Sequence, residues 1–123
     1  MGEYMQIRGM LQDGEEYAGL ILGMDYPAYP LVLLPGDSSD VSWPPAVDWA
    51  NGHGGALPTR RELALLFANL RESFERNWYW SSEPHATRAQ LVWGQNFASG
   101  IQTIYGRPYR GHARAIRRIS TAA

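Results

Sequence analysis

The sequence predicts an α+β domain in which antiparallel strands pack with two helices, and three observations carry this prediction. A β-rich hairpin pattern covers residues 17–34, a helix with a complete start signal begins at residue 60, and further strand patterns follow residue 78. A run of strands, then helices, then strands again is typical of α+β domains with antiparallel sheets. At 123 residues the chain is expected to form a single domain, 1–123, with residues 1–39 as its N-terminal hairpin region.

The hairpin is expected to comprise two strands, over residues 17–24 and 29–34. Turn signals stand before the first strand, at Gln12-Asp13-Gly14, and between the two strands, where Asp25 and Pro27 lie. Pro35-Gly36 then ends the second strand. Residues 37–40 combine small hydroxyl and acidic side chains, a composition that predicts a loop.

The first helix is expected to be short and to begin at a pair of prolines. Pro44 and Pro45 fit only the first turn of a helix, which places Ser42 or Trp43 at its N-cap. Gly52 is a typical residue to end it. The expected inner face of this helix consists of Ala46, Trp49 and Ala50.

The second helix is expected over residues 60–72. Thr59 and Glu62 have the spacing of a capping box, in which each side chain accepts a hydrogen bond from the backbone N–H of the other. Four apolar residues with helical spacing then predict the buried face: Leu63, Leu66, Phe67 and Leu70.

Two arginines, Arg60 and Arg61, lie in the first turn of this helix, where the helix dipole disfavours cations. Their side chains are therefore expected either to pair with carboxylates, such as Glu62 or an acid of the first half, or to face a ligand. The remaining chain predicts strands over residues 78–82, 90–97, 101–105 and 112–119. A turn at residues 98–100 makes a hairpin of the second and third of these strands.

Several of these segments resemble, in order, the domain at the C-terminus of Lcl-type collagen-like adhesins, which is widespread in bacterial and prophage proteins. The matching motifs are the Leu-Pro-Thr-basic-x-Glu helix start at 57–62, Tyr-Trp-Ser-Ser at 79–82, the aromatic segment 93–100 and the basic last strand 113–119. Residues 42–50 look like the preceding helix of that family. The resemblance covers roughly residues 40–119 and implies a C-type-lectin-like fold. It implies no single activity, because function resides in individual sites on a fold.

Composition excludes several kinds of chemistry. The chain contains no cysteine, which rules out disulfides, thiolate metal sites and thiol nucleophiles, and all 11 of its basic residues are arginine. Without lysine, Schiff-base chemistry is also excluded. The formylglycine-generating relatives of the C-type-lectin-like fold use cysteines with copper, so that route is closed. His53, His85 and His112 lack the spacing of metal ligands. We therefore expect no metal site, no cofactor and no enzymatic activity.

Charge is distributed unevenly along the chain. Residues 1–55 hold eight acidic side chains and one arginine, whereas residues 56–123 hold four acidic side chains and ten arginines. Such asymmetry indicates either a basic binding face or two halves that pair their charges within one domain. We favour pairing, because a pI near 6.3 is far from that of nucleic-acid-binding domains, and a nucleic acid is not an expected partner.

Neither a signal peptide nor a membrane span is expected from the sequence. Residues 1–13 are mixed polar and apolar, and the longest apolar runs, 18–24 and 31–34, have only the length of strands. The expected location is the cytoplasm, or a phage particle assembled there.

The best candidate site lies in the late loops, which we define as residues 83–88 and 105–112. Tyrosine and arginine are enriched at binding hot spots, because they offer rigid area and directional donors. In C-type-lectin-like domains the ligand surface generally lies among the late loops and the adjoining strands. The candidate ligand-binding residues are Arg88, Tyr105, Arg107, Tyr109, Arg110 and His112.

Two functions compete at this stage. The first is a non-catalytic binding module of phage or prophage origin that recognises a protein or glycan ligand through its late loops. The alternative is a cytoplasmic phage accessory protein that binds and modulates a host macromolecule, as an inhibitor does. Exposed strand edges and the apolar strand at 17–24 also predict homo-oligomers.

Overall fold

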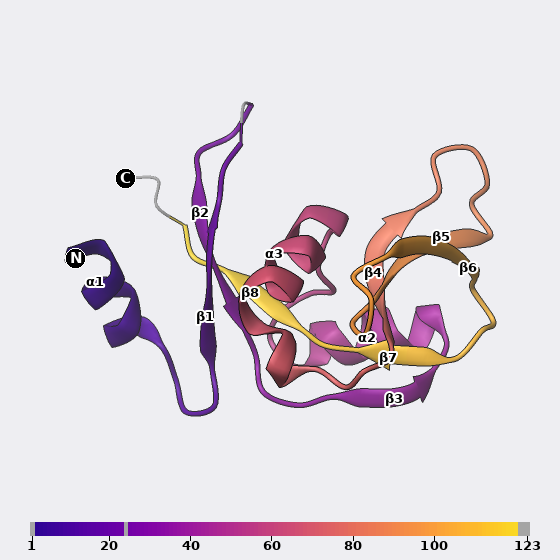
Figure 1. Cartoon of the computed structure of the whole chain (residues 1–123), viewed down its shortest axis with the longest axis horizontal. Helices are drawn as coiled ribbons and strands as arrows, with labels where there is room; N and C mark the ends of the chain where they lie inside the picture. The colour runs from indigo at the N-terminus through magenta and orange to yellow at the C-terminus, as the bar shows by residue number, and fades with distance from the viewer. Residues whose placement is uncertain (1, 24, 121–123) are drawn as a thin grey trace.

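The computed structural model describes residues 2–23 and 25–120, and its fold is α+β (Figure 1). The described residues form three α-helices, one 3-10 turn and eight strands. Their order is α1 (Gly2–Met10), β1 (Glu16–Ile21), β2 (Tyr29–Leu33), β3 (Ser38–Val41), α2 (Trp43–Gly52), α3 (Arg60–Leu70), η1 (Arg71–Ser73), β4 (Trp78–Pro84), β5 (Leu91–Asn96), β6 (Gln102–Gly106), β7 (Gly111–Ala113) and β8 (Ile116–Arg118).

The strands form two sheets, and two continuous stretches of the chain each contribute one strand to both sheets. One sheet has the order β1-β2-β8, and the other has the order β3-β7-β4-β5-β6. The stretch that holds β2 and β3 runs beside the stretch that holds β7 and β8, and each passes from one sheet to the other (Figure 1). Between the sheets, the N–H of Leu34 still donates to the carbonyl of Ala115 at 3.0 Å. This pair of stretches therefore fixes the two sheets relative to each other.

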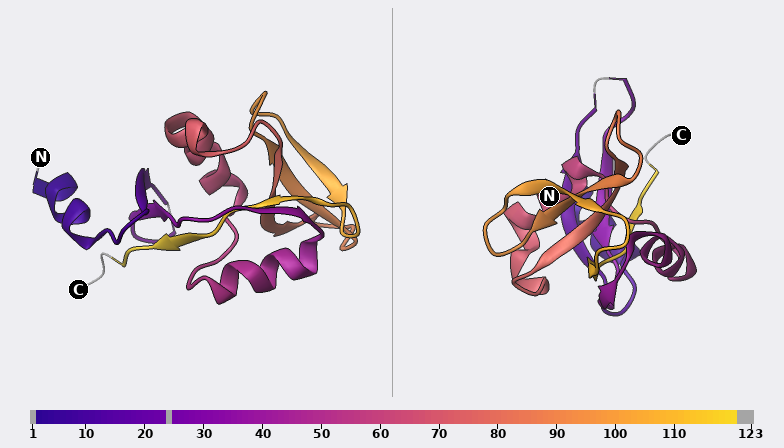
Figure 2. Two further views of the ribbon diagram at one scale, coloured as in Figure 1. Left: turned by 90° about the horizontal axis from the view of Figure 1, so that it is seen from below. Right: turned by 90° about the vertical axis from the view of Figure 1, so that its right-hand side faces the viewer.

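Helices α2 and α3 lie on opposite sides of the strands (Figure 2), and β4 provides core residues to both sides. Tyr79 packs with Leu63 and Leu66 of α3, whereas its neighbour Trp80 packs with Ala46 and Ala50 of α2. Successive side chains of a strand point to opposite faces, so a strand covered on both faces reads as continuously apolar. The aromatic run at the start of β4 is explained by this position.

The expected start of α3 is confirmed. The Thr59 side chain accepts from the Glu62 N–H, and the Glu62 carboxylate accepts from the Thr59 N–H, so both bonds of the capping box are present. Leu63 and Leu66 are fully buried on the expected face. The helix ends at Leu70 and continues as the 3-10 turn η1.

The expected α2 is also confirmed, with Ser42 at its N-cap and prolines in its first turn. Ala46 and Ala50 are fully buried, whereas Trp49 is half-buried. The connection to α3 is tight, because Gly55 passes directly over β8. A Cβ atom at Gly55 would lie 2.2 Å from the carbonyl oxygen of Ile116, which only glycine avoids.

The predicted secondary structure misses α1 and β3. The chain has a third helix, α1, where two helices were expected; Met5, Gln6 and Arg8 favour helix although their stretch lacks a clear apolar period. Residues 37–40 were expected to form a loop, but β3 pairs with β7 there. Asp40 has a φ of 53°, in the left-handed region, and the register shifts beside it, as at a β-bulge.

The closing strand expected over residues 112–119 is also corrected, because it consists of two short strands, β7 and β8. The interruption at Arg114 and Ala115 is where this stretch changes sheets. Strand pairing is not purely antiparallel, since β4 and β7 pair in parallel through Tyr79 and His112. The first strand ends at Ile21, before the expected residue 24, and Met24 lies outside the described residues.

Charges pair between the two halves of the chain, as the sequence analysis favours. Arg117 binds Glu15 at 2.9 Å, and Arg110 lies 3.5 Å from Asp40. Among the helices of the described chain, none combines the length and apolarity needed to cross a membrane.

Replacing Leu66 by alanine should destabilise the domain by about 2–5 kcal/mol, because the side chain is fully buried between α3 and the sheet. Leu22, which is 62% exposed, is the matched control, and Leu22→Ala should change the free energy of unfolding by less than about 0.5 kcal/mol. Urea denaturation measures both. A Leu66 variant as stable as the wild type would contradict this position for the helix.

Candidate functional site

A cleft of about 770 Å³ lies between the β1–β2 hairpin, the start of α3 and strands β4–β6. We call it the hairpin–helix cleft. It brings together three arginines, one carboxylate and two tyrosines, which come from segments far apart in the sequence: Tyr26, Tyr29, Arg60, Arg61, Glu83 and Arg118. A volume of this size is typical of sites for small molecules.

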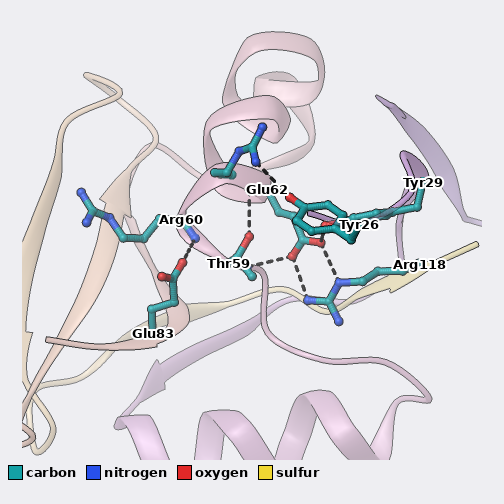
Figure 3. Close-up of polar contacts among 8 residues, drawn as sticks. Tyr26, Tyr29, Thr59, Arg60, Glu62, Glu83 and Arg118 are labelled. Atoms are coloured by element: carbon teal, nitrogen blue, oxygen red, sulfur yellow. Dashed lines mark hydrogen bonds and ion pairs between the residues drawn. The ribbon is translucent and has the colours of Figure 1, made fainter. Parts of the chain in front are cut away.

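The buried carboxylate of Glu62 anchors one wall of the cleft (Figure 3). Its side chain is 0% exposed and accepts four hydrogen bonds. One oxygen accepts from the Thr59 N–H at 2.8 Å and from Arg118 Nη2 at 2.9 Å, and the other accepts from the Tyr29 hydroxyl at 2.5 Å and from Arg118 Nε at 2.7 Å. The carboxylate therefore joins α3, β2 and β8.

These contacts set the protonation states in this wall. Burial alone would raise the pKa of Glu62, but the hydrogen bonds from Arg118, Tyr29 and Thr59 outweigh burial, so the pKa lies below its usual value. Burial and the neighbouring Glu62 carboxylate raise the pKa of Tyr29 to about 12. At neutral pH Glu62 is ionised and Tyr29 is protonated. Because every lone pair of the carboxylate is used, Glu62 serves to hold the fold rather than to transfer protons.

The two arginines of the first turn of α3 have different surroundings. Arg61 donates from Nη1 to the Tyr26 hydroxyl at 2.9 Å and from Nη2 to the Leu22 carbonyl at 2.6 Å, which ties the hairpin tip to the helix. Arg60 extends the other way (Figure 3). Its guanidinium carbon lies 3.6 Å from the ring centre of Trp93 of β5. Neither guanidinium pairs with Glu62, which binds Arg118 instead.

Arg107 links the second late loop to residues 89–90, which directly follow the first late loop. Its Nε donates to the Ala89 carbonyl at 2.7 Å, and its backbone N–H donates to the Gln90 carbonyl at 3.0 Å. Its guanidinium lies 4.5 Å from the ring centre of Trp43, whose backbone N–H donates to the Arg107 carbonyl at 3.1 Å. The sequence indicates Arg107 as a ligand contact; in the structure it holds the second late loop against residues 89–90 and Trp43.

The other late-loop residues divide into packed and exposed ones. Tyr105 stacks on Trp78 with ring centres 3.7 Å apart, and burial raises its pKa, so one face of its ring is already covered. Tyr109 is 64% exposed, and Arg88 is also exposed. Among the described residues, Arg110 forms only a 3.5 Å ion pair with Asp40 at the surface, which contributes little to stability. Tyr109, Arg110 and Arg88 thus remain accessible to a partner.

His112, the last of the predicted contacts, lies in a second cavity of about 520 Å³ beside β3. Its Nδ1 is 2.9 Å from Asp37, whose other oxygen accepts from the Tyr79 hydroxyl at 2.5 Å. Burial and Asp37 raise the pKa of Tyr79 above its usual value. Within the described chain, Asp37 is the only hydrogen-bond partner of the His112 ring, so no hydroxyl stands ready as a nucleophile.

In the described part of the chain, no group of three or more histidine or acidic side chains is placed to hold a metal ion. Sequence reasoning drew attention to Arg60 and Arg61 through their unfavourable place in the helix. It missed Tyr26, Glu83 and the other lining residues of the cleft, because each is isolated in sequence and only the fold brings them together.

Neither models of protein families nor curated protein sequences match this chain.

Replacing Arg118 by glutamine should destabilise the domain more than replacing Glu62 by glutamine. Arg118→Gln leaves a fully buried carboxylate without its cation, at a cost of up to about 3 kcal/mol. Glu62→Gln leaves an arginine whose side chain is 40% exposed and can reach water, and glutamine still serves the capping box. Urea denaturation at neutral pH measures the order of the two variants. The reverse order would contradict this account of Glu62.

The same carboxylate should make stability depend on pH. The folded-state pKa of Glu62 is lowered, so its contribution is complete above the unfolded pKa and is lost as the pH falls through the folded pKa. The stability advantage of the wild type over Glu62→Gln should therefore shrink below about pH 4. An advantage that stays constant under acidic conditions would show that Glu62 is not a charged partner.

Proposed function

We propose that this chain is a non-catalytic binding module of phage or prophage origin with a C-type-lectin-like fold, which recognises a protein or glycan ligand through its late loops. The fold and origin in this proposal rest on the resemblance of residues 40–119 to the Lcl-type domains. The observation that supports binding most directly is the contact of Arg107, in the second late loop, with residues 89–90, which directly follow the first late loop.

Arg107 supports binding in two ways: it holds the loops in place, and it leaves other side chains of the loops exposed to a ligand. Arg107 ties residues 89–90 to the 106–111 turn through its Nε and its backbone N–H, and its guanidinium rests on Trp43, so these contacts hold the loops before a ligand arrives. Pre-ordering lowers the entropic cost of binding. Tyr109, Arg110 and Arg88 then present the residue types that dominate binding energy at interfaces.

The lack of catalytic activity in this proposal rests on the chemistry of the side chains. The carboxylate of Glu62 is saturated with donors, and among the described residues no hydroxyl is hydrogen-bonded to the His112 ring, whose partner is Asp37. An enzyme of the acyl-transfer kind needs a nucleophile in hydrogen-bond reach of its base. Binding is the function that these groups support.

Replacing Tyr109 and Arg110 together by alanine should abolish or strongly weaken ligand binding and leave the melting temperature nearly unchanged. Both side chains are exposed, and surface changes usually shift stability by less than about 0.5 kcal/mol. Loss of a tyrosine or arginine hot spot typically costs about 2 kcal/mol or more in affinity. Recovery of a partner from bacterial lysate tests a protein ligand, and a glycan array tests a glycan ligand.

The matched control is Ile101→Ala combined with Arg71→Ala. Ile101 is 64% exposed, as Tyr109 is, and both control residues lie outside the late loops. This variant should bind as the wild type does. Equal binding by the Tyr109 and Arg110 variant would place the ligand elsewhere on the molecule, and substrate turnover that depends on one residue would overturn the non-catalytic assignment.

A further inference from the structure

We infer that the hairpin–helix cleft is a second binding site, which takes the carboxylate group of a ligand through the two terminal nitrogens of Arg60. None of the late-loop ligand contacts proposed above lines the cleft, and of the cleft residues Glu83 alone lies within the late loops, at their first position. The inference rests on how Arg60 is held, on which of its donors are unused, and on the charges around it.

Three contacts hold Arg60 in place. Its Nε donates to the side-chain oxygen of Gln102 at 2.9 Å, its guanidinium stacks on Trp93, and its backbone N–H donates to the Glu83 carboxylate at 2.6 Å. The guanidinium is thus ordered by the fold. A side chain ordered in advance loses little conformational entropy when it binds a ligand.

Gln102 is fixed in turn by a buried chain of amide groups. Its Nε2 donates to the Arg60 carbonyl at 2.8 Å and to the side-chain oxygen of Gln95 at 2.7 Å. Gln95 is 1% exposed and donates to the Leu63 carbonyl at 3.3 Å. The oxygen of Gln102 therefore has one orientation, toward Arg60 Nε, and this orientation sets the plane of the guanidinium.

The outer edge of the guanidinium is unused. Among the described residues, no protein group accepts a hydrogen bond from Nη1 or Nη2 of Arg60. The two other arginines of the cleft differ, since Arg61 uses both terminal nitrogens on the hairpin tip and Arg118 is paired with Glu62. Two parallel N–H groups in one plane match the two oxygens of a carboxylate or phosphate.

The charge balance of the cleft selects a carboxylate over a phosphate. Glu62 and Arg118 neutralise each other, and the two remaining arginines of the cleft, Arg60 and Arg61, exceed the one remaining carboxylate, Glu83, by one charge, because Arg61 hydrogen-bonds only to the uncharged Tyr26 hydroxyl and Leu22 carbonyl. A phosphate dianion brings one negative charge more than the cleft can balance, and the Glu83 carboxylate in the cleft wall adds repulsion. A singly charged carboxylate matches one free guanidinium with less repulsion.

The remaining lining indicates what else the ligand carries. Tyr26 is 43% exposed and lines the cleft together with Ile21 and Ala64. These side chains offer apolar and aromatic surface. The expected ligand is therefore an acid with an aromatic or aliphatic group, either a free small molecule or the C-terminal residue of a peptide, which share this chemistry.

Isothermal titration calorimetry with three related probes tests the inference. N-acetyl-phenylalanine has the carboxylate and an aromatic ring, N-acetyl-phenylalanine amide lacks the charge, and phenyl phosphate carries the dianion. We expect the acid to bind, and the amide and the phosphate to bind at least about tenfold more weakly. Equal binding of acid and amide, tighter binding of the phosphate, or no binding of the acid at millimolar concentration would each overturn the inference.

Variants locate the bound carboxylate. Arg60→Gln should weaken the acid at least about tenfold, and Arg60→Lys should also weaken it, because lysine keeps the charge but loses the paired donors. Arg71→Gln is the matched control, since Arg71 also stacks on an aromatic ring, 4.3 Å from the centre of Phe67, but lies outside the cleft. Near-UV circular dichroism confirms that each variant is folded. Unchanged affinity in both Arg60 variants would refute the site.

A second variant tests the role assigned to Glu83 without touching Arg60. Glu83→Gln keeps an oxygen that accepts from the Arg60 N–H but removes the negative charge. The preference for N-acetyl-phenylalanine over phenyl phosphate should fall in this variant, and an unchanged preference would contradict the role of charge in the cleft.

A peptide that ends in phenylalanine distinguishes the two sources of the carboxylate, a free acid and a peptide C-terminus. Tighter binding than that of N-acetyl-phenylalanine supports a peptide C-terminus, and equal binding supports a small free acid.

Discussion

The buried carboxylate of Glu62 is the interaction on which the rest of the structure depends. It accepts four hydrogen bonds, from the Thr59 backbone, the Tyr29 hydroxyl and two nitrogens of Arg118. A buried charge is tolerated only where it is paired and its hydrogen bonds are satisfied. Because the donors belong to α3, β2 and β8, satisfying this one group positions the three-stranded sheet against the helix.

Each of the two candidate sites is positioned by a cluster of contacts that joins separate segments of the chain. The Glu62 cluster and the Arg61 contacts with the hairpin tip set the distance between the hairpin and α3, which shapes the cleft. At the other end of the molecule, Arg107 rests on Trp43 and ties the second late loop to residues 89–90. In both places arginine is used as a multiple donor that joins separate segments, a task that a single ammonium group performs less well.

Local chemistry explains what the sequence predicted, and long-range contacts explain what it did not. The capping box at Thr59 and the spacing of Leu63 and Leu66 are local signals, so α3 was predictable to within a turn. The partner of Glu62 is 56 residues away, and no local pattern identifies Arg118 among the late arginines. Likewise β3 has the composition of a loop and becomes a strand only through its pairing with β7. The late loops were found by residue type, but the type alone did not distinguish a bracing arginine such as Arg107 from an exposed one.

Hydrogen exchange of the backbone amides in a Glu62→Ala variant tests most directly whether this carboxylate couples the sheet to the helix. Alanine removes all four hydrogen bonds at once, including those of Tyr29 and Arg118. If Glu62 couples these elements, the amides of β2 and β8 should lose protection together with the first turn of α3. Loss of protection confined to α3, with β2 and β8 as protected as in the wild type, would show that Glu62 only caps its helix.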